Sequence, residues 1–141
     1  QTCALPIFTQ YNGGIVLKAS LPFSQLMPFA AEFAELCNKP GLGNGFSAQA
    51  GVGTAHFFLW SEMAGERTNV LARAAEQAIT ICEQFGGRAT AEWFGFDFDG
   101  KMDPWGQLGG PSGGDFALMQ QIKRAVDPSG IMSPGRFYGG I

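Results

Sequence analysis

The residue best suited to acid–base chemistry is His56, the only histidine among the 141 residues. Imidazole is the side chain that most readily takes up and releases a proton near neutral pH, so His56 is a candidate general base. It lies in residues 54–60, whose alternating pattern predicts a strand. Because a lone histidine on a strand often has a structural role instead, both interpretations stay open.

Charged and amide side chains gather with His56 on one predicted face of a sheet. In residues 14–21, alternation puts Ile15 and Leu17 toward a core and Lys18 toward the opposite face. The same reasoning across three further segments predicts a mixed face made of Lys18, Gln49, His56, Phe58, Trp60, Arg88, Glu92 and Phe94. This face has too many aromatic rings for plain solvent and too many charges for a core, which suits a covered, partly polar pocket. The alternative is a solvated sheet face with a few exposed aromatic side chains.

Six segments must position these side chains. They are strands at 14–21, 46–51, 54–60 and 88–94 and helices at 26–37 and 67–85, with residues 42–45 expected as a loop. The order strand, helix, strand, strand, helix, strand predicts an α+β fold of the ferredoxin-like, split βαβ type. In that fold an antiparallel sheet carries both helices on one face. We therefore assign residues 8–95 to one βαββαβ domain.

The composition changes beyond this domain. Residues 96–114 are rich in Gly and Pro and are predicted to form a long loop, and residues 115–141 to form a helix followed by an extended tail. Two proline turns are predicted in the tail: residues 127–130 suit a type I turn, and residues 133–136 suit a type II turn. An irregular, mostly apolar tail is costly to order unless it docks on a surface.

Composition also excludes several classes of function. A net charge of −3 gives no electrostatic basis for nucleic-acid binding, and no apolar run approaches the ~20 residues of a membrane span. The spacing of Cys37 and Cys82 fits neither a zinc nor a redox motif, so we interpret both as buried thiols in a reducing, cytoplasmic compartment. Glycines at 41, 43 and 45 are only a weak phosphate signal, because they lack the spacing of a phosphate-binding loop.

The first seven residues of the chain resemble the translation of a common sequencing-adapter oligonucleotide. The chain has no initiator methionine and no signal-peptide pattern. We therefore expect the natural sequence to begin near Phe8, within a longer protein, and Cys3 not to be native.

The tail from residue 127 to residue 141, supported by residues 17–22 and 103–106, resembles the C-terminal part of FAD-linked oxidases of the vanillyl-alcohol-oxidase type. Within that family the likeness is nearest to the FAD-binding subunit of glycolate oxidase. Residues 49–56 are also similar to a His-Ala-Gly-x-Gly-x-x-His pattern found in flavin-linked 2-hydroxy-acid dehydrogenases. Gln49 stands where that pattern has its first histidine, so we expect no metal site here.

This resemblance implies a role for the whole chain. An FAD-binding domain would precede residues 8–95, which would be the cap or substrate domain, and the tail would return toward the flavin. The implied reaction is the oxidation of a 2-hydroxy acid such as glycolate or lactate, with hydride transfer to FAD. The resemblance also implies iron–sulfur and second flavin subunits as partners, through which a cytoplasmic enzyme would lie at the membrane periphery.

The resemblance also implies roles for individual residues of the mixed face. His56 would be the catalytic base, and Lys18 or Arg88 would hold the substrate carboxylate, for which a planar guanidinium is well suited. Gln49 and Glu92 would orient the substrate.

In the tail, Ser133 and Arg136 would bind the cofactor, although many relatives have Asn where Ser133 stands. Two alternatives stay open: the same family acting on a sugar, lactone or aromatic alcohol, and a ferredoxin-like binding module with no catalytic role. A binding module would fold alone as a monomer with a solvated sheet face.

Overall fold

The computed structural model describes residues 13–61, 67–95, 114–136 and 138–141, and the chain divides into two compact units, residues 1–106 and 107–141. Predicted features at residues 1–12 and 96–113, including Cys3 and the Gly/Pro-rich loop, lie outside the described residues. The first unit contains β1 (Gly14–Ser20), η1 (Phe23–Gln25), α2 (Leu26–Leu36), β2 (Leu42–Gln49), η2 (Ala50–Val52), β3 (Thr54–Ser61), α3 (Arg67–Gln84) and β4 (Arg88–Phe94). The second contains α4 (Gly114–Val126) and η3 (Tyr138–Gly140).

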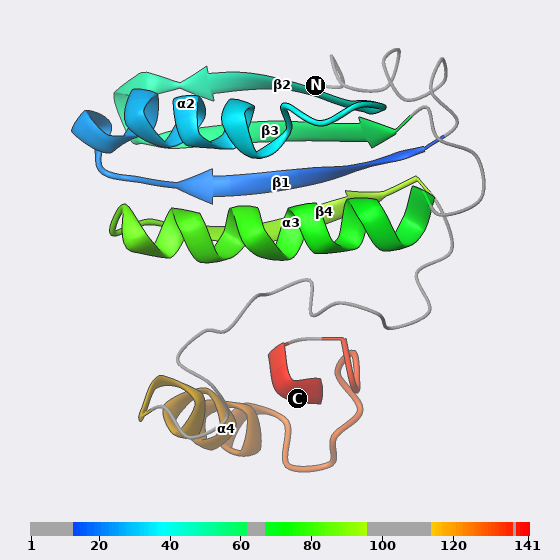
Figure 1. Cartoon of the computed structure of the whole chain (residues 1–141). Coiled ribbons are helices and arrows are strands. Elements are labelled where there is room, and N and C mark those ends of the chain that lie inside the picture. The colour runs from blue at the N-terminus through cyan, green and yellow to red at the C-terminus, as the bar shows by residue number, and fades with distance from the viewer. Residues whose placement is uncertain (1–12, 62–66, 96–113, 137) are drawn as a thin grey trace. The chain divides into compact units, whose positions relative to one another are not determined.

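The first unit is the α+β fold predicted from the sequence. Its four strands form one antiparallel sheet in the order β2-β3-β1-β4. Both α2 and α3 lie along the same face of this sheet (Figure 1). The prediction of a split βαβ sheet with its helices on one face is therefore confirmed.

Alternation in the strands fills the space between the sheet and its helices. Ile15 and Leu17 of β1 are buried there with Phe57 of β3. The rings of Phe29 and Phe33 on α2 meet the Phe57 ring edge-on, with centroids 4.9 and 4.8 Å away. Burying each such ring contributes roughly 1.5–3 kcal/mol. Because this core takes one face of the sheet, every second side chain of the central strands must lie on the other, which we call the helix-free face.

The prediction of a loop at residues 42–45 was wrong. These residues form the first half of β2, and Leu42 pairs with Ser61 while Gly43 pairs with Trp60. Two glycines in four residues weaken the local strand signal, but the long neighbouring strand β3 supplies the hydrogen-bonding partner. The strand predicted at residues 46–51 ends at Gln49, because a short helical turn, η2, begins at Ala50.

The face of Phe94 was also predicted incorrectly. The register between β1 and β4 shifts once: Leu17 pairs with Ala91, but Val16 pairs with Trp93. This β-bulge gives β4 one extra residue, Glu92, and exchanges the faces beyond it. As a result Phe94 packs against the core, and Trp93 takes its place on the helix-free face.

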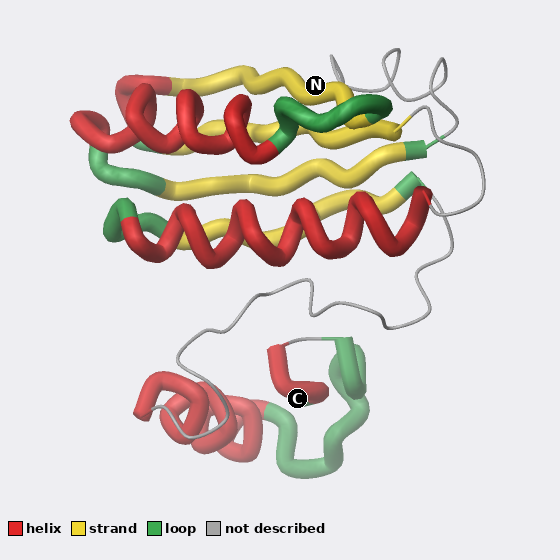
Figure 2. Tube along the Cα trace, viewed as in Figure 1, coloured by secondary structure: helices red, strands yellow, loops and turns green. Residues whose placement is uncertain are grey.

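The second unit consists of α4 and the tail, which Figure 2 shows as loop and turn ending in the short helical segment η3. Both predicted proline turns are present. The Gly130 N–H donates to the Asp127 carbonyl at 3.1 Å, and the Arg136 N–H donates to the Ser133 carbonyl at 3.2 Å. Gly135 has φ 72°, the conformation that a type II turn needs at its third position.

A buried carboxylate joins the end of α4 to the tail. The two oxygens of Asp127 accept the N–H groups of Ile131 and Met132 at 3.0 and 2.9 Å. The ammonium of Lys123, one turn earlier, lies 2.6 Å from the same carboxylate and also donates to the Met132 carbonyl. We call these contacts the Asp127 clamp. The Lys123 hydrogen bond, followed by the two N–H groups, holds the pKa of Asp127 below its ordinary value.

The far end of the tail packs on the start of α4. Phe116 and Tyr138 are both buried, and their rings meet at 89° with centroids 5.3 Å apart. Gly139 follows at φ 62°, and a Cβ there would lie 2.4 Å from the Phe116 ring. Among the described residues, no helix is both long and apolar enough to cross a membrane.

The Asp127 clamp predicts a loss of tail structure at low pH. Because the folded pKa of Asp127 lies below the unfolded one, its stabilisation is fully present above the unfolded pKa of about 4 and is lost as pH falls through the folded value. We expect the Ile131 and Met132 amide proton resonances to shift together in an NMR titration from pH 6 to pH 2. The same amides in Asp127→Asn should show no such transition, and a wild-type titration without one would contradict the clamp.

Candidate functional site

Three predicted site residues meet on the helix-free face. Lys18 and His56 are directly paired across β1 and β3, and Glu92 reaches them from β4. The Lys18 Nζ lies 3.0 Å from Glu92 Oε1, and the His56 Nε2 lies 3.4 Å from Glu92 Oε2. We call Lys18, His56 and Glu92 the polar cluster. Glu92 is the extra residue of the bulge in β4, the strand beside β1.

The ion pairs of the polar cluster add little to the stability of the fold, but they can orient the His56 imidazole. Each of its side chains is 40–44% exposed, and ion pairs of this kind contribute about 0–1 kcal/mol to folding. The contact that matters chemically joins Nε2 of His56 to the carboxylate. An imidazole that donates its Nε2 proton to Glu92 has a free lone pair on Nδ1, which can accept a proton from another molecule.

The remaining two predicted substrate residues lie at opposite edges of the sheet. Arg88 begins β4 and pairs with Ser20, whereas Gln49 ends β2 and pairs with Thr54. Three strand spacings separate β4 from β2, so the two backbones are ~14 Å apart. Gln49 is one strand from His56 and Arg88 is two. The structure thus brings Lys18, His56 and Glu92 together and places Arg88 and Gln49 on either side of them.

Aromatic side chains adjoin the polar cluster on the same face. Phe58 and Trp60 follow His56 at alternate positions of β3, and Trp93 lies on β4 across from Val16. The Trp60 ring lies against the backbone of β2, where a Cβ on Gly43 would come within 2.1 Å of it. Sequence reasoning missed both Trp93 and this role of Gly43. The alternation of Gly43 and Gly45, which pair with Trp60 and Phe58, could have indicated a strand with large rings packed against it.

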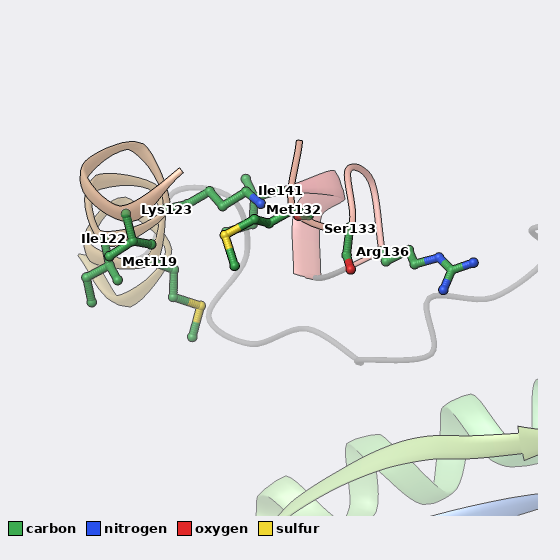
Figure 3. Close-up of a pocket in the computed structure, with 8 residues that line it drawn as sticks. Met119, Ile122, Lys123, Met132, Ser133, Arg136 and Ile141 are labelled. Carbon is green, nitrogen blue, oxygen red and sulfur yellow. Dashed lines mark hydrogen bonds between the residues drawn. The ribbon is translucent and has the colours of Figure 1, made fainter. Parts of the chain in front are cut away.

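The predicted cofactor residues of the tail border a separate cavity. Its volume is about 420 Å³, and it lies between α4 and the tail (Figure 3). We call it the tail groove; it is lined by Met119, Ile122, Lys123, Val126, Met132, Ser133, Arg136 and Ile141. Ser133 has φ 47°, a left-handed conformation that is rare for residues other than glycine.

The second unit has an exposed apolar surface that shares three side chains with the tail groove: Ile122, Val126 and Met132. Five large hydrophobic side chains are more than half exposed there: Leu118, Ile122, Val126, Ile131 and Met132. The cationic side chain of Arg136 stands beside Ser133 and points away from Met119 and Ile122 in Figure 3. No ion pair involves it within the part of the chain that the structure describes.

The two cysteines that the structure describes offer no nucleophile. Cys37 and Cys82 are both buried and unpaired with one another, as the sequence predicted. Burial raises the pKa of Cys37 to about 11 and that of Cys82 to about 12, which disfavours the reactive thiolate. Over residues 13–61, 67–95, 114–136 and 138–141, no group of three or more His, Cys, Asp or Glu side chains could hold a metal ion.

Comparison with protein families gave one match, and it covers most of the chain. The family model described as FAD linked oxidases, C-terminal domain, matches residues 7–94 and 105–137. These ranges include the sheet with its polar cluster and all residues that line the tail groove except Ile141. Searches of the curated proteins and of solved structures found no match.

The contact between Trp60 and Gly43 can be tested by substitution. We expect Gly43→Ala to lower the free energy of unfolding by about 1–3 kcal/mol, because the added methyl group must displace the indole ring. Chemical denaturation followed by Trp fluorescence measures this. The matched control is Gly51→Ala, where no atom lies within 4 Å of the added carbon. Equal losses in the two variants would contradict the packing role of Gly43.

Proposed function

Because the chain belongs to the FAD-linked oxidase family as its C-terminal domain, we propose that it forms the substrate-binding part of an FAD-dependent oxidoreductase that oxidises a 2-hydroxy acid. The family establishes FAD as the cofactor and oxidation–reduction as the chemistry. The observation that carries the substrate proposal is the polar cluster, in which the Glu92 carboxylate lies 3.0 Å from the Lys18 ammonium and 3.4 Å from the chain's sole imidazole.

His56 is the base of the proposed reaction. Its Nδ1 accepts the proton of the substrate hydroxyl, while Glu92 holds the ring through Nε2 and stabilises the imidazolium that forms. When FAD is bound, it would supply the acceptor for the hydride equivalent, which leaves the carbon that bears the hydroxyl group. In this proposal the chain supplies a positioned base and the contacts that hold the substrate, and the redox chemistry belongs to the cofactor.

Lys18 is better placed than Arg88 to hold the substrate carboxylate. It faces His56 directly across β1 and β3, whereas Arg88 lies two strands away at the edge of the sheet. A carboxylate bound at Lys18 puts the adjacent hydroxyl-bearing carbon next to the imidazole, as a small 2-hydroxy acid requires. Gln49, one strand away from His56, is placed to donate a hydrogen bond to the substrate, and Glu92 orients both the base and Lys18.

The tail groove provides a second set of contacts, which we assign to FAD. Its apolar lining suits a flat ring system, and the Ser133 hydroxyl and Arg136 guanidinium suit the polar, electron-rich edges of a flavin. Its volume of about 420 Å³ lies in the range of small-molecule sites. The donor set of this groove therefore fits part of the cofactor.

In this proposal an FAD-binding domain precedes residue 8 in the complete enzyme and covers the exposed apolar surface of the second unit. Iron–sulfur and further flavin subunits would pass on the electrons, and through them a cytoplasmic enzyme would lie at the membrane periphery. An open reading frame for an FAD-binding domain in the DNA upstream of Phe8 would support this arrangement. The alternative of a non-catalytic binding module predicts no such frame.

A second candidate substrate class is supported by the aromatic side chains. Phe58, Trp60 and Trp93 border the polar cluster on the helix-free face. Glycolate and lactate have almost no apolar surface to place there, whereas an aromatic alcohol would stack on these rings. Turnover of glycolate, lactate and an aromatic alcohol by the same flavoenzyme would distinguish these classes.

Removing the base tests the role of His56. In the full-length flavoenzyme we expect His56→Ala to lower kcat about 10²–10⁴-fold, as for the loss of a positioned general base. Bound FAD, measured by its visible absorption, should not change. Ser20→Ala, at an exposed position of the same sheet face, is the control and should keep full activity. Unchanged turnover in His56→Ala would overturn the base assignment.

The two cations can be compared directly. We expect Lys18→Met to raise KM about tenfold or more with a smaller change in kcat, because a charge-assisted bond to bound substrate is lost. Arg88→Met should raise KM less, since Arg88 lies two strands from His56. Steady-state kinetics with a 2-hydroxy acid measures both. A larger effect of Arg88→Met would place the carboxylate at the edge of the sheet instead.

A further inference from the structure

The tail groove has two walls of different origin. Met119, Ile122 and Val126 come from α4, whereas Met132, Ser133 and Arg136 come from the tail after it (Figure 3). The helical wall is held rigid by its own backbone hydrogen bonds. The second wall has no such ladder, so its position depends on contacts that tie the tail to the helix.

Two sets of contacts tie the tail to α4, one at each end. At one end Phe116 packs edge-on against Tyr138. At the other, the Asp127 clamp holds the tail where it leaves the helix, through Ile131 and Met132. The Asp127 side chain is only 3% exposed, so water replaces these hydrogen bonds poorly and the clamp is the stronger constraint on the residues that follow it.

The clamp acts directly on Ser133. Its last contacts fix both the N–H and the carbonyl of Met132, so the peptide that enters Ser133 is held in place. Ser133 then adopts φ 47°, a conformation that surrounding contacts must impose on a residue with a side chain. The type II turn starts at the same residue and carries Arg136. The direction of Arg136 is therefore set from Asp127 through Met132 and Ser133.

We propose that Asp127 is a positioning residue for FAD: its carboxylate holds the tail so that Ser133 and Arg136 face the flavin, without touching the cofactor itself. This inference rests on the proposed function, which assigns the tail groove to FAD. The inference assigns Asp127 the role of fixing the tail side of the groove before FAD binds. Lys123 supports this role through its ion pair with Asp127.

A double-mutant cycle in the full-length flavoenzyme tests this proposal. FAD dissociation constants are measured by titrating the apoprotein and following flavin fluorescence for wild type, Asp127→Asn, Arg136→Ala and the double variant. We expect each single variant to raise the FAD dissociation constant about tenfold. The dissociation constant of the double variant should be no higher than that of the single variant that binds FAD more weakly. The visible flavin absorption band should shift in the same direction in both single variants, because both lose the contact of Arg136.

Separate outcomes identify which claim fails. Additive losses in the double variant, or an Asp127→Asn enzyme that binds FAD like wild type while Arg136→Ala does not, would overturn the role of Asp127 alone. An Arg136→Ala enzyme with unchanged FAD affinity would overturn both the assignment of the groove and this inference. Should Asp127→Asn fold poorly, Asp127→Glu replaces it, since it keeps the charge but displaces the carboxylate from the two amides, whereas Lys123 lines the groove itself and is left unchanged. Glu32→Gln, at an exposed position on α2, is the charge control.

Discussion

The packing of α2 on Phe57 is the constraint on which the sheet of the first unit depends. Phe29 and Phe33 meet the Phe57 ring at 4.9 and 4.8 Å, and Phe57 is fully buried. Side chains alternate along a strand, so a slip of one residue would expose Phe57 and bury His56. The free energy of burying aromatic rings on one face thus keeps an ionisable side chain on the other. The polar cluster is a consequence of the core and not a feature added to it.

Alternation alone was enough to predict much of this arrangement from the sequence. It placed Lys18 and His56 on one face of neighbouring strands, and the order of the elements predicted the topology. Alternation cannot predict a β-bulge, after which the side chains of a strand switch to the opposite faces. The bulge at Glu92 depends on how β4 pairs with β1, so Phe94 was assigned to the wrong face and Trp93 was missed. The glycines of β2 look like a loop until Trp60 is known to lie opposite them.

The tail shows the same division between local and non-local information. Both proline turns follow from residue types at fixed positions, and the structure contains them. In the Asp127 clamp, the ion pair with Lys123 has a spacing that a sequence can suggest, but the other two donors are backbone N–H groups, which almost every residue has. Nothing in the side chains of Ile131 and Met132 marks them as partners. A sequence can therefore predict that the tail turns, whereas only the structure shows what fixes the turn in space.

The polar cluster and the tail groove differ in what they need from a partner. The ion pairs of Lys18, Glu92 and His56 are about 40% exposed, and water screens them to a small net energy. The same charges interact several times more strongly when a bound molecule excludes that water, because the effective dielectric constant falls. A covered cluster therefore binds an anion and directs the imidazole far better than an exposed one does. The groove is apolar and gains most from covering its hydrophobic lining. For this reason the proposed function assigns the polar cluster to the substrate and the tail groove to the cofactor.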